Sequence, residues 1–222
     1  MAVGDEITVC DMDKTEYRCV LSRITDTEVD ARVLSSAPSA TEPRYAATVY
    51  QALPKGDKLD SIIQKAVECG VYAVVPFESE RCVVRVKLDA EAKKTERRMK
   101  IAAEAAKQSG RGMLPTVSET VSFVRMLEMA KEADVKLFCY EGSDTLPLGR
   151  ALPVDAMKAM IAEGKEPTVS IVIGSEGGFA PSEVAAAVAA GMTPIGLGKR
   201  ILRTETAASF VLSAMVYALE LF

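Results

Sequence analysis

Residues 171–187, IVIGSEGGFAPSEVAAA, predict a strand, a glycine-rich loop and a helix in immediate succession. The apolar run ends in the loop 174–178, and Pro181 and Ser182 then open a helix with Glu183 in its first turn. Three glycines around one carboxylate permit backbone conformations that other residues avoid, and they let a ligand lie directly against the main chain. The loop is therefore a candidate ligand site, and a tight turn without a ligand is the alternative.

Working outward from this loop, strands and helices alternate over most of the chain. Strands are predicted at residues 71–77, 135–141, 168–174 and 193–198, and helices at residues 54–70, 91–109, 118–133, 155–164, 181–191 and 204–222. Such alternation indicates an α/β fold with a mostly parallel sheet and helices on both faces.

The first fifty residues have a different pattern. Short alternating segments predict strands at residues 5–10, 16–24, 27–35 and 44–53, as in a small β-barrel or sandwich. We therefore expect an N-terminal β-rich domain over residues 1–45 and an α/β domain over residues 46–222.

The composition narrows the possible chemistry. With 222 residues, 49% of them apolar, the chain can bury a substantial core. The absence of histidine excludes Ser-His-Asp and Cys-His catalysis and the commonest zinc ligand, which leaves carboxylates, Arg, Lys, Tyr, backbone amides or a reactive cofactor. Five cysteines without a CxxC pair suggest free core thiols and a cytoplasmic location. No stretch predicts a membrane span or an export signal.

Positive charge gathers in two places although the net charge is −4. Residues 80–111 contain ten Lys or Arg and five acids, which fits either a solvated helix face or a contact with phosphates. In the second place, LGKRILRTETAA (residues 197–208), Gly198 ends a strand and Thr204 is a candidate N-cap. Three cations, Lys199, Arg200 and Arg203, precede the last helix, where its dipole disfavours them. This segment is either a site for an anionic ligand or an accident of the surface.

Five blocks in colinear order resemble one known family. They are LPKGDKLDSIIQKAVECGV, VVPFESERCV, ERRMKIAAEAAKQSGR, IGSEGGFAPSE and LGKRILRTETAA. Together they resemble the SPOUT-class ribosomal small-subunit RNA (uracil-N3) methyltransferases, over about residues 3–222. The resemblance implies a PUA-like RNA-binding β domain, a C-terminal SPOUT α/β domain with a deep trefoil knot, and a homodimer. The β domain is expected to be N-terminally incomplete, and the family usually has proline where this chain has Ser175 and Lys199.

The resemblance also implies S-adenosylmethionine-dependent methylation of uridine N3 in 16S ribosomal RNA of the small subunit, without a metal. The cofactor residues carried over are Glu141, Gly142, Ile173, Gly174, Glu176, Gly177, Gly178, Leu197, Gly198, Ile201, Leu202 and Thr204. We expect Arg203 to stabilise negative charge on the uracil and Glu205 to position it or remove its proton. A water molecule or an RNA phosphate is the alternative acceptor of that proton. The candidate RNA contacts are Arg81, Arg97, Arg98, Lys100 and Arg111.

Two other functions remain open from the sequence. One is a SPOUT methyltransferase with a different RNA or a different target atom, and the other is a non-catalytic RNA-binding or assembly protein. A dinucleotide oxidoreductase is disfavoured, because the glycine loop lies late in the domain and lacks the GxGxxG spacing.

Overall fold

The computed structural model describes residues 1–11, 13–86 and 88–222, so Lys87 of the basic segment lies outside it. The chain forms two compact units, which we describe separately. The first comprises Met1–Glu42 and Ala106–Leu114, and the second comprises Pro43–Ala105 and Pro115–Phe222. The prediction placed every residue after 45 in one domain, whereas the segment Ala106–Leu114 groups with the first unit. Among the described residues, no helix is long and apolar enough to cross a membrane.

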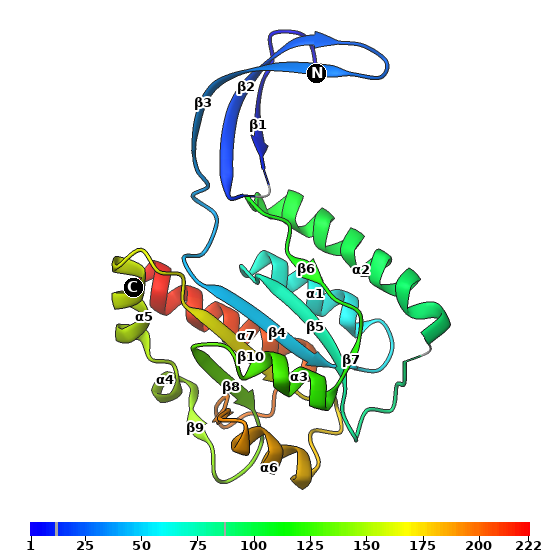
Figure 1. Ribbon diagram of the computed structural model, residues 1–222, viewed down its shortest axis with the longest axis vertical. Coiled ribbons are helices and arrows are strands. Elements are labelled where there is room, and N and C mark those ends of the chain that lie inside the picture. Colours follow the sequence, from blue (N-terminus) through cyan, green and yellow to red (C-terminus); the bar gives the residue numbers. More distant parts are fainter. Residues whose placement is uncertain (12, 87) are drawn as a thin grey trace. The chain divides into compact units, whose positions relative to one another are not determined.

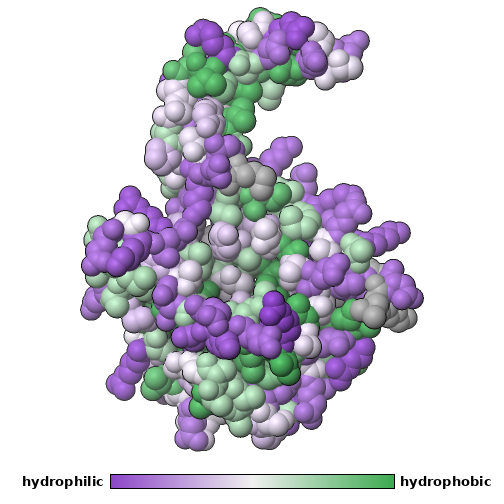
Figure 2. Space-filling view, in the orientation of Figure 1, coloured by the Kyte–Doolittle hydropathy of each residue, from purple (hydrophilic) through white to green (hydrophobic). Residues whose placement is uncertain are grey.

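The first unit contains an antiparallel sheet of three strands in the order β1-β2-β3. The strands are β1 (Glu6–Cys10), β2 (Thr15–Ile24) and β3 (Val29–Pro38). Only Cys19 and Leu21 are buried among the strand residues, and every residue of β3 is exposed. Apolar side chains therefore reach the surface of this unit, as the green patches in Figure 2 show. The exposed Cys10 contradicts the expectation that all five cysteines are core thiols.

A buried ion pair holds the two segments of the first unit together. Arg111 donates from Nε and Nη2 to the two carboxylate oxygens of Glu42, each at 2.8 Å, and both side chains are only 4% exposed. The backbone N–H of Gly112 donates to the same carboxylate at 2.7 Å. Burial alone raises the pKa of Glu42, but the guanidinium and the backbone donors outweigh it and hold that pKa below its usual value.

The second unit is built on a sheet of eight strands, and every strand pairing in it is parallel. Along the sheet the order is β6-β5-β4-β10-β8-β11-β9, with β7 also pairing with β5. The strands are β4 (Ala46–Ala52), β5 (Ala73–Glu78), β6 (Thr116–Val117), β7 (Val121–Ser122), β8 (Val135–Cys139), β9 (Leu146–Pro147), β10 (Thr168–Ile173) and β11 (Thr193–Gly196). The predicted α/β fold with a mostly parallel sheet is confirmed.

Helices cover both faces of this sheet. The helices of the chain are α1 (Lys58–Glu68), α2 (Leu88–Ser109), α3 (Phe123–Ala130), α4 (Leu148–Ala151), α5 (Val154–Ala162), α6 (Pro181–Ala189) and α7 (Thr204–Val216), which continues as a π-helical turn (Tyr217–Leu221). The last residues of α2, from Ala106, group with the first unit. In the view of Figure 1, α1 and α7 pack against each other behind the sheet and α3 lies in front of it. The short β6, β7, β9 and α4 were not predicted.

The helix predicted at residues 118–133 begins later than expected, at Phe123. Val121 and Ser122 instead pair with the end of β5, and the Ser122 hydroxyl caps the helix by accepting from the backbone N–H of Arg125 at 3.2 Å. Strand pairing and a serine cap outweigh the helical periodicity of the preceding residues.

Strand β10 lies at the centre of the fold, between β4 and β8. Its residues from Val169 to Ile173 are buried, which explains why all of them except Ser170 are apolar. From β4 the chain moves outward to β5 and then crosses to β8 on the other side of β10. In parallel sheets, ligands usually bind where the strand order reverses, outside the carboxyl ends of the strands.

We predict that Glu42→Gln destabilises the protein. The change leaves the buried Arg111 guanidinium facing a neutral amide, which costs about 3–5 kcal/mol of unfolding free energy. Urea unfolding at neutral pH measures this loss of unfolding free energy. Because folding lowers the pKa of Glu42, the stabilisation is present above the usual value of 4.5 and is lost as the pH falls through the lower folded-state value. The variant and the wild type should therefore converge in acid.

The exposed pair of Glu96 and Lys100 provides the matched control, because the change Glu96→Gln breaks an ion pair that water already screens. We expect no measurable loss of unfolding free energy in Glu96→Gln. Equal effects of the two substitutions would contradict a special role for the buried pair. Faster amide exchange at Gly112 and Met113, which donate to Glu42, would locate the loss in the first unit.

Candidate functional site

A pocket of about 680 Å³ opens at the carboxyl edge of the parallel sheet, within the range of small-molecule sites. Its walls come from the loops that follow β8, β10 and β11, with Lys58 and Arg81 added from the segments after β4 and β5. The structure gathers here all twelve residues predicted to contact the cofactor, together with Arg203, Glu205 and Arg81. Side chains separated by up to about 150 positions in the sequence thus surround one cavity.

Backbone geometry and close contacts within the protein explain why the loop 174–178 contains glycines. Gly178 has a φ of +64°, which favours glycine. A Cβ on Gly177 would lie 2.9 Å from the backbone oxygen of Arg81, and one on Gly174 would lie 3.0 Å from the Phe179 ring. The tight-turn interpretation therefore explains the glycines, and the evidence for a ligand must come from other atoms of the pocket.

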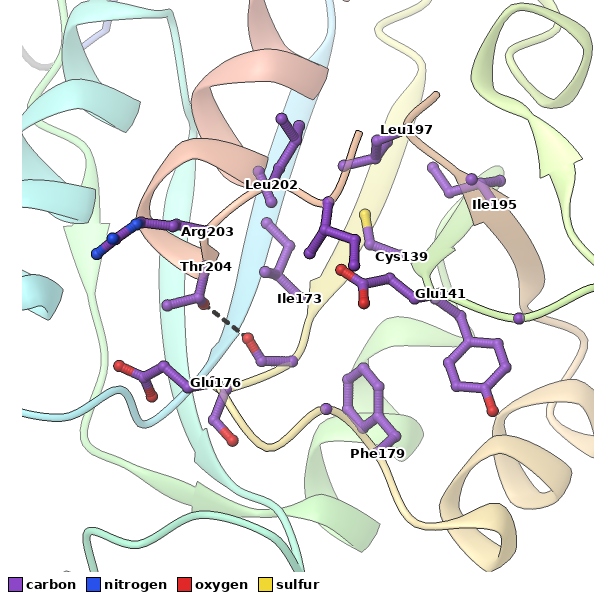
Figure 3. Close-up of a pocket in the computed structure, with 18 of the residues that line it drawn as sticks. Cys139, Glu141, Ile173, Glu176, Phe179, Ile195, Leu197, Leu202, Arg203 and Thr204 are labelled. Atoms are coloured by element: carbon purple, nitrogen blue, oxygen red, sulfur yellow. Dashed lines mark hydrogen bonds between the residues drawn. The ribbon is translucent and has the colours of Figure 1, made fainter. Parts of the chain in front are cut away.

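Thr204 joins three segments at the base of the pocket. Its hydroxyl donates to the Gly174 carbonyl at 2.7 Å (Figure 3) and accepts from Gln51 Nε2 at 2.9 Å. Gln51 lies fully buried near the end of β4. The sequence prediction made Thr204 the N-cap of the last helix, but Arg203 holds that position and Thr204 is the first helical residue. The hydroxyl anchors the glycine loop to α7 instead of capping the helix.

Glu176 is the carboxylate within the glycine loop. It accepts from Lys58 Nζ at 2.7 Å and from the backbone N–H of Lys55 at 3.2 Å. Burial raises the pKa of this carboxyl, but the Lys58 ammonium and the backbone N–H groups outweigh the burial and hold the pKa below its usual value. Lys58 also lies 3.7 Å from Glu205 Oε2, so two acids share one ammonium group.

Glu183 connects the glycine loop to the segment after β5. Its carboxylate accepts from the backbone N–H of Ala180 at 2.9 Å, at the start of α6, and from that of Glu80 at 2.8 Å. Glu183 is itself buried. The acid predicted in the first turn of this helix thus fixes two loops that border the pocket.

Two buried oxygens in the pocket have no hydrogen-bond partner in the described structure, Ser175 Oγ and Glu205 Oε2. Buried polar atoms are rarely left unpaired, because each lost hydrogen bond to water must be replaced. Ser175 is only 8% exposed. These two atoms are the strongest sign that a polar ligand completes this pocket.

One wall of the pocket is apolar, as Figure 3 shows. Ile173, Ile195, Leu197, Leu202 and Phe179 line it together with Cys139. Burial raises the pKa of the Cys139 thiol to about 12, so this thiol is protonated at neutral pH and acts as part of the apolar surface. The Glu141 carboxylate points into the pocket toward this wall.

The rim of the pocket is cationic. Lys199, Arg200 and Arg203 are exposed at the start of α7, and Arg81 is exposed on the segment after β5. Figure 3 shows the Arg203 side chain pointing away from the apolar wall. It makes no hydrogen bond or ion pair with any residue that the structure describes. A negatively charged group at the rim would find this guanidinium available.

The five predicted RNA contacts fall into two groups. Arg81, Arg97 and Lys100 are exposed, and the latter two form ion pairs with Asp60 and Glu96. Arg98 and Arg111 are buried in ion pairs with Glu91 and Glu42, so they are unavailable to an RNA phosphate and that prediction is corrected. Charge counting along the sequence does not reveal burial.

Sequence reasoning missed Gln51, Lys58 and the hydroxyl of Ser175. Gln51 carried a signal, since it is the one strongly polar side chain in the apolar strand segment AATVYQA. Among the described residues, no group of three or more Cys, Asp or Glu side chains could hold a metal ion.

Comparisons with known proteins agree with this geometry. A family model described as an RNA methyltransferase domain matches residues 41–216. The Bacillus subtilis protein named ribosomal RNA small subunit methyltransferase E is 36% identical over 221 residues, which cover 100% of this chain and 85% of that protein. The protein of the same name from Mesomycoplasma hyopneumoniae is 32% identical over 196 residues, covering 88% and 80%.

One similar solved structure contains a bound ligand. The crystal structure of a ribosomal RNA small subunit methyltransferase E from Neisseria gonorrhoeae, bound to S-adenosyl methionine, superimposes with a TM-score of 0.83 at 29% identity. The superposition covers 99% of this chain and 85% of that one.

Proposed function

This chain belongs to the RNA methyltransferase family, among the ribosomal RNA small subunit methyltransferases E, and from that premise we propose that it methylates uridine N3 in 16S ribosomal RNA. The methyl donor is S-adenosylmethionine. The observation that carries the proposal is the pocket itself, which combines an apolar wall, a cationic rim and two buried oxygens without a hydrogen-bond partner in the described part of the chain.

The residues present suit S-adenosylmethionine. The apolar wall of Ile173, Leu197 and Leu202 suits the adenine ring, and the backbone groups of the glycine loop suit its polar edge. Glu141 can accept hydrogen bonds from the ribose hydroxyls. Ser175 Oγ, which has no partner in the described structure, can pair with a polar group of the ligand.

S-adenosylmethionine, when bound, supplies a methyl group on a positively charged sulfur. Uracil N3 carries a proton at neutral pH and becomes a good nucleophile only as that proton leaves. Arg203 at the rim stabilises the negative charge that develops on the uracil, and Glu205 is the carboxylate available for the proton. Most of the rate comes from alignment of the two reactants in a preorganised site.

Exposed cations supply affinity for the ribosomal RNA substrate. Arg81, Lys199 and Arg200 surround the pocket, and Arg97 and Lys100 extend the positive surface along α2. Phosphate contacts of this kind orient RNA without reading its sequence. The selection of one uridine then depends on the shape of the RNA at the pocket.

We also propose the finer architecture that the family resemblance implies. The first unit is a PUA-like RNA-binding domain, the second is a SPOUT domain with a trefoil knot, and two chains form a homodimer. Exposed apolar residues on α7 and the turn after it, Phe210 and Tyr217 among them, support an interface there. A sedimentation mass of 23.8 kDa, that of a single chain, would count against the dimer.

We expect the protein to form N3-methyluridine when it is incubated with labelled S-adenosylmethionine and small ribosomal subunits that lack this modification. Arg203→Ala should lower the rate of methyl transfer about 100-fold, because it removes a charge that the transition state needs. Nucleoside mass analysis identifies the product.

Arg150→Ala, which removes an exposed arginine outside the pocket, should leave that rate unchanged. A methylated nucleoside other than N3-methyluridine would assign a different target atom. Cofactor binding without any transfer would favour the non-catalytic RNA-binding function.

A second prediction concerns Ser175→Ala, which should affect the free and the bound protein in opposite directions. Without ligand, the change removes an unpaired buried hydroxyl, so the melting temperature should stay equal or rise. With S-adenosylmethionine, it removes a hydrogen bond, so calorimetry should show about two- to tenfold weaker binding. Ser182→Ala, at an exposed serine of α6, is the control and should change neither quantity. Unchanged affinity in Ser175→Ala would remove the hydroxyl from the binding site.

A further inference from the structure

Lys58 stands between two carboxylates of the pocket, and sequence reasoning gave it no role. Its Nζ lies 2.7 Å from Glu176 Oε1 and 3.7 Å from Glu205 Oε2. The three residues come from different parts of the chain: the first residue of α1, the loop after β10 and the first turn of α7. When all three are ionised, one cation faces two acids and the cluster carries a net charge of about −1.

The two carboxylates differ in their hydrogen bonds. Glu176 accepts from the Lys58 ammonium and from the Lys55 backbone N–H. Glu205 Oε2, in contrast, is buried and accepts no hydrogen bond in the described structure. Hydrogen bonds to the ionised form keep a carboxylate ionised, whereas an oxygen without a donor is free to receive a proton.

Building on the proposed function, we propose that Lys58 is a positioning residue that divides two tasks between these carboxylates. It keeps Glu176 ionised as the anchor of the glycine loop, and it leaves Glu205 as the base that takes the N3 proton. In that step the N3–H bond breaks and an O–H bond forms on Glu205 Oε2. The electron pair left on N3 makes the new bond to the methyl carbon, and the pair from the broken carbon–sulfur bond goes to sulfur.

The charges around Lys58 favour this assignment. Uptake of one proton by Glu205 changes the cluster from net −1 to neutral and leaves Lys58 and Glu176 paired one to one. The hydrogen bond with Glu176 and the charges of Glu176 and Glu205 raise the pKa of Lys58, against opposing effects of burial and of Arg203. The ammonium therefore stays charged throughout the neutral range.

Two substitutions should move the pH dependence of the reaction in opposite directions. Lys58→Met removes the cation shared by two acids, so the acidic limb of the pH–rate profile should move to higher pH. We also expect a fall of about tenfold or more in the single-turnover rate at neutral pH. Glu176→Gln leaves Lys58 with Glu205 alone, which strengthens that ion pair, so the acidic limb should move to lower pH. Both profiles are measured at saturating S-adenosylmethionine and small subunits.

Lys65→Met is the matched control, because Lys65 is an exposed lysine of the same helix. Its profile should coincide with that of the wild type, and Lys58→Arg, which keeps the charge, should recover most of the activity. If Lys58→Met and Lys65→Met give the same profile, or if Lys58→Met only weakens S-adenosylmethionine binding in calorimetry, the inference is wrong. Melting curves show whether each variant is folded. If Lys58→Met does not fold, the pH–rate profile of Glu176→Gln tests the role of Lys58.

Failure of the proposed function has a different signature. In that case the wild type itself forms no N3-methyluridine on small subunits. Wild-type turnover with unmoved pH profiles in both variants overturns only the role of Lys58.

Discussion

The parallel pairing of β10 with both β4 and β8 is the constraint on which the pocket depends. Because these strands run in one direction, their carboxyl ends lie at the same edge of the sheet, and β11 brings a fourth loop there by pairing with β8. The apolar run of β10 holds this arrangement, since its side chains are buried on both faces. The loops that carry most of the polar groups of the pocket thus depend on strands that are mostly apolar, and Gln51 of β4 is the strand residue that hydrogen-bonds to Thr204 at the base of the pocket.

The glycines of the loop 174–178 are not themselves evidence for a ligand. Gly174 and Gly177 are required by close contacts inside the chain, with Phe179 and Arg81, and Gly178 by its positive φ. A glycine-rich loop after a strand therefore reports how tightly the backbone turns. What points to a ligand is the pair of buried oxygens on Ser175 and Glu205 that have no hydrogen-bond partner among the described residues.

The longer strands and helices and the loops that line the pocket could be predicted from the sequence, because both depend on residues that are neighbours along the chain. Contacts between residues that lie far apart in the sequence could not be predicted. Gln51 and Thr204 are hydrogen-bonded across 153 positions, and Lys58 meets Glu176 across 118. The same reason explains Arg111, whose partner Glu42 lies 69 residues away. The ion pair of Arg98 could have been predicted from the sequence. Glu91 precedes Arg98 by seven residues, about two helical turns, so both lie on the same helix face.

The start of α7 shows how stability and chemistry oppose each other at this site. A helix N-terminus disfavours cations, yet Arg203 occupies the N-cap position, and Lys199 and Arg200 lie just before it. Arg203 has no ion-pair partner among the described residues, and Glu205 is the acid in the first turn of this helix.

The helix is held in place by other means, through the Thr204 hydroxyl on the glycine loop and through the buried Ala208 and Val211. Violations of local preference of this kind concentrate at functional sites. In the mechanism that we propose, the Arg203 guanidinium at this helix start stabilises an anionic uracil, and the Glu205 carboxylate in the first turn of the same helix accepts its proton.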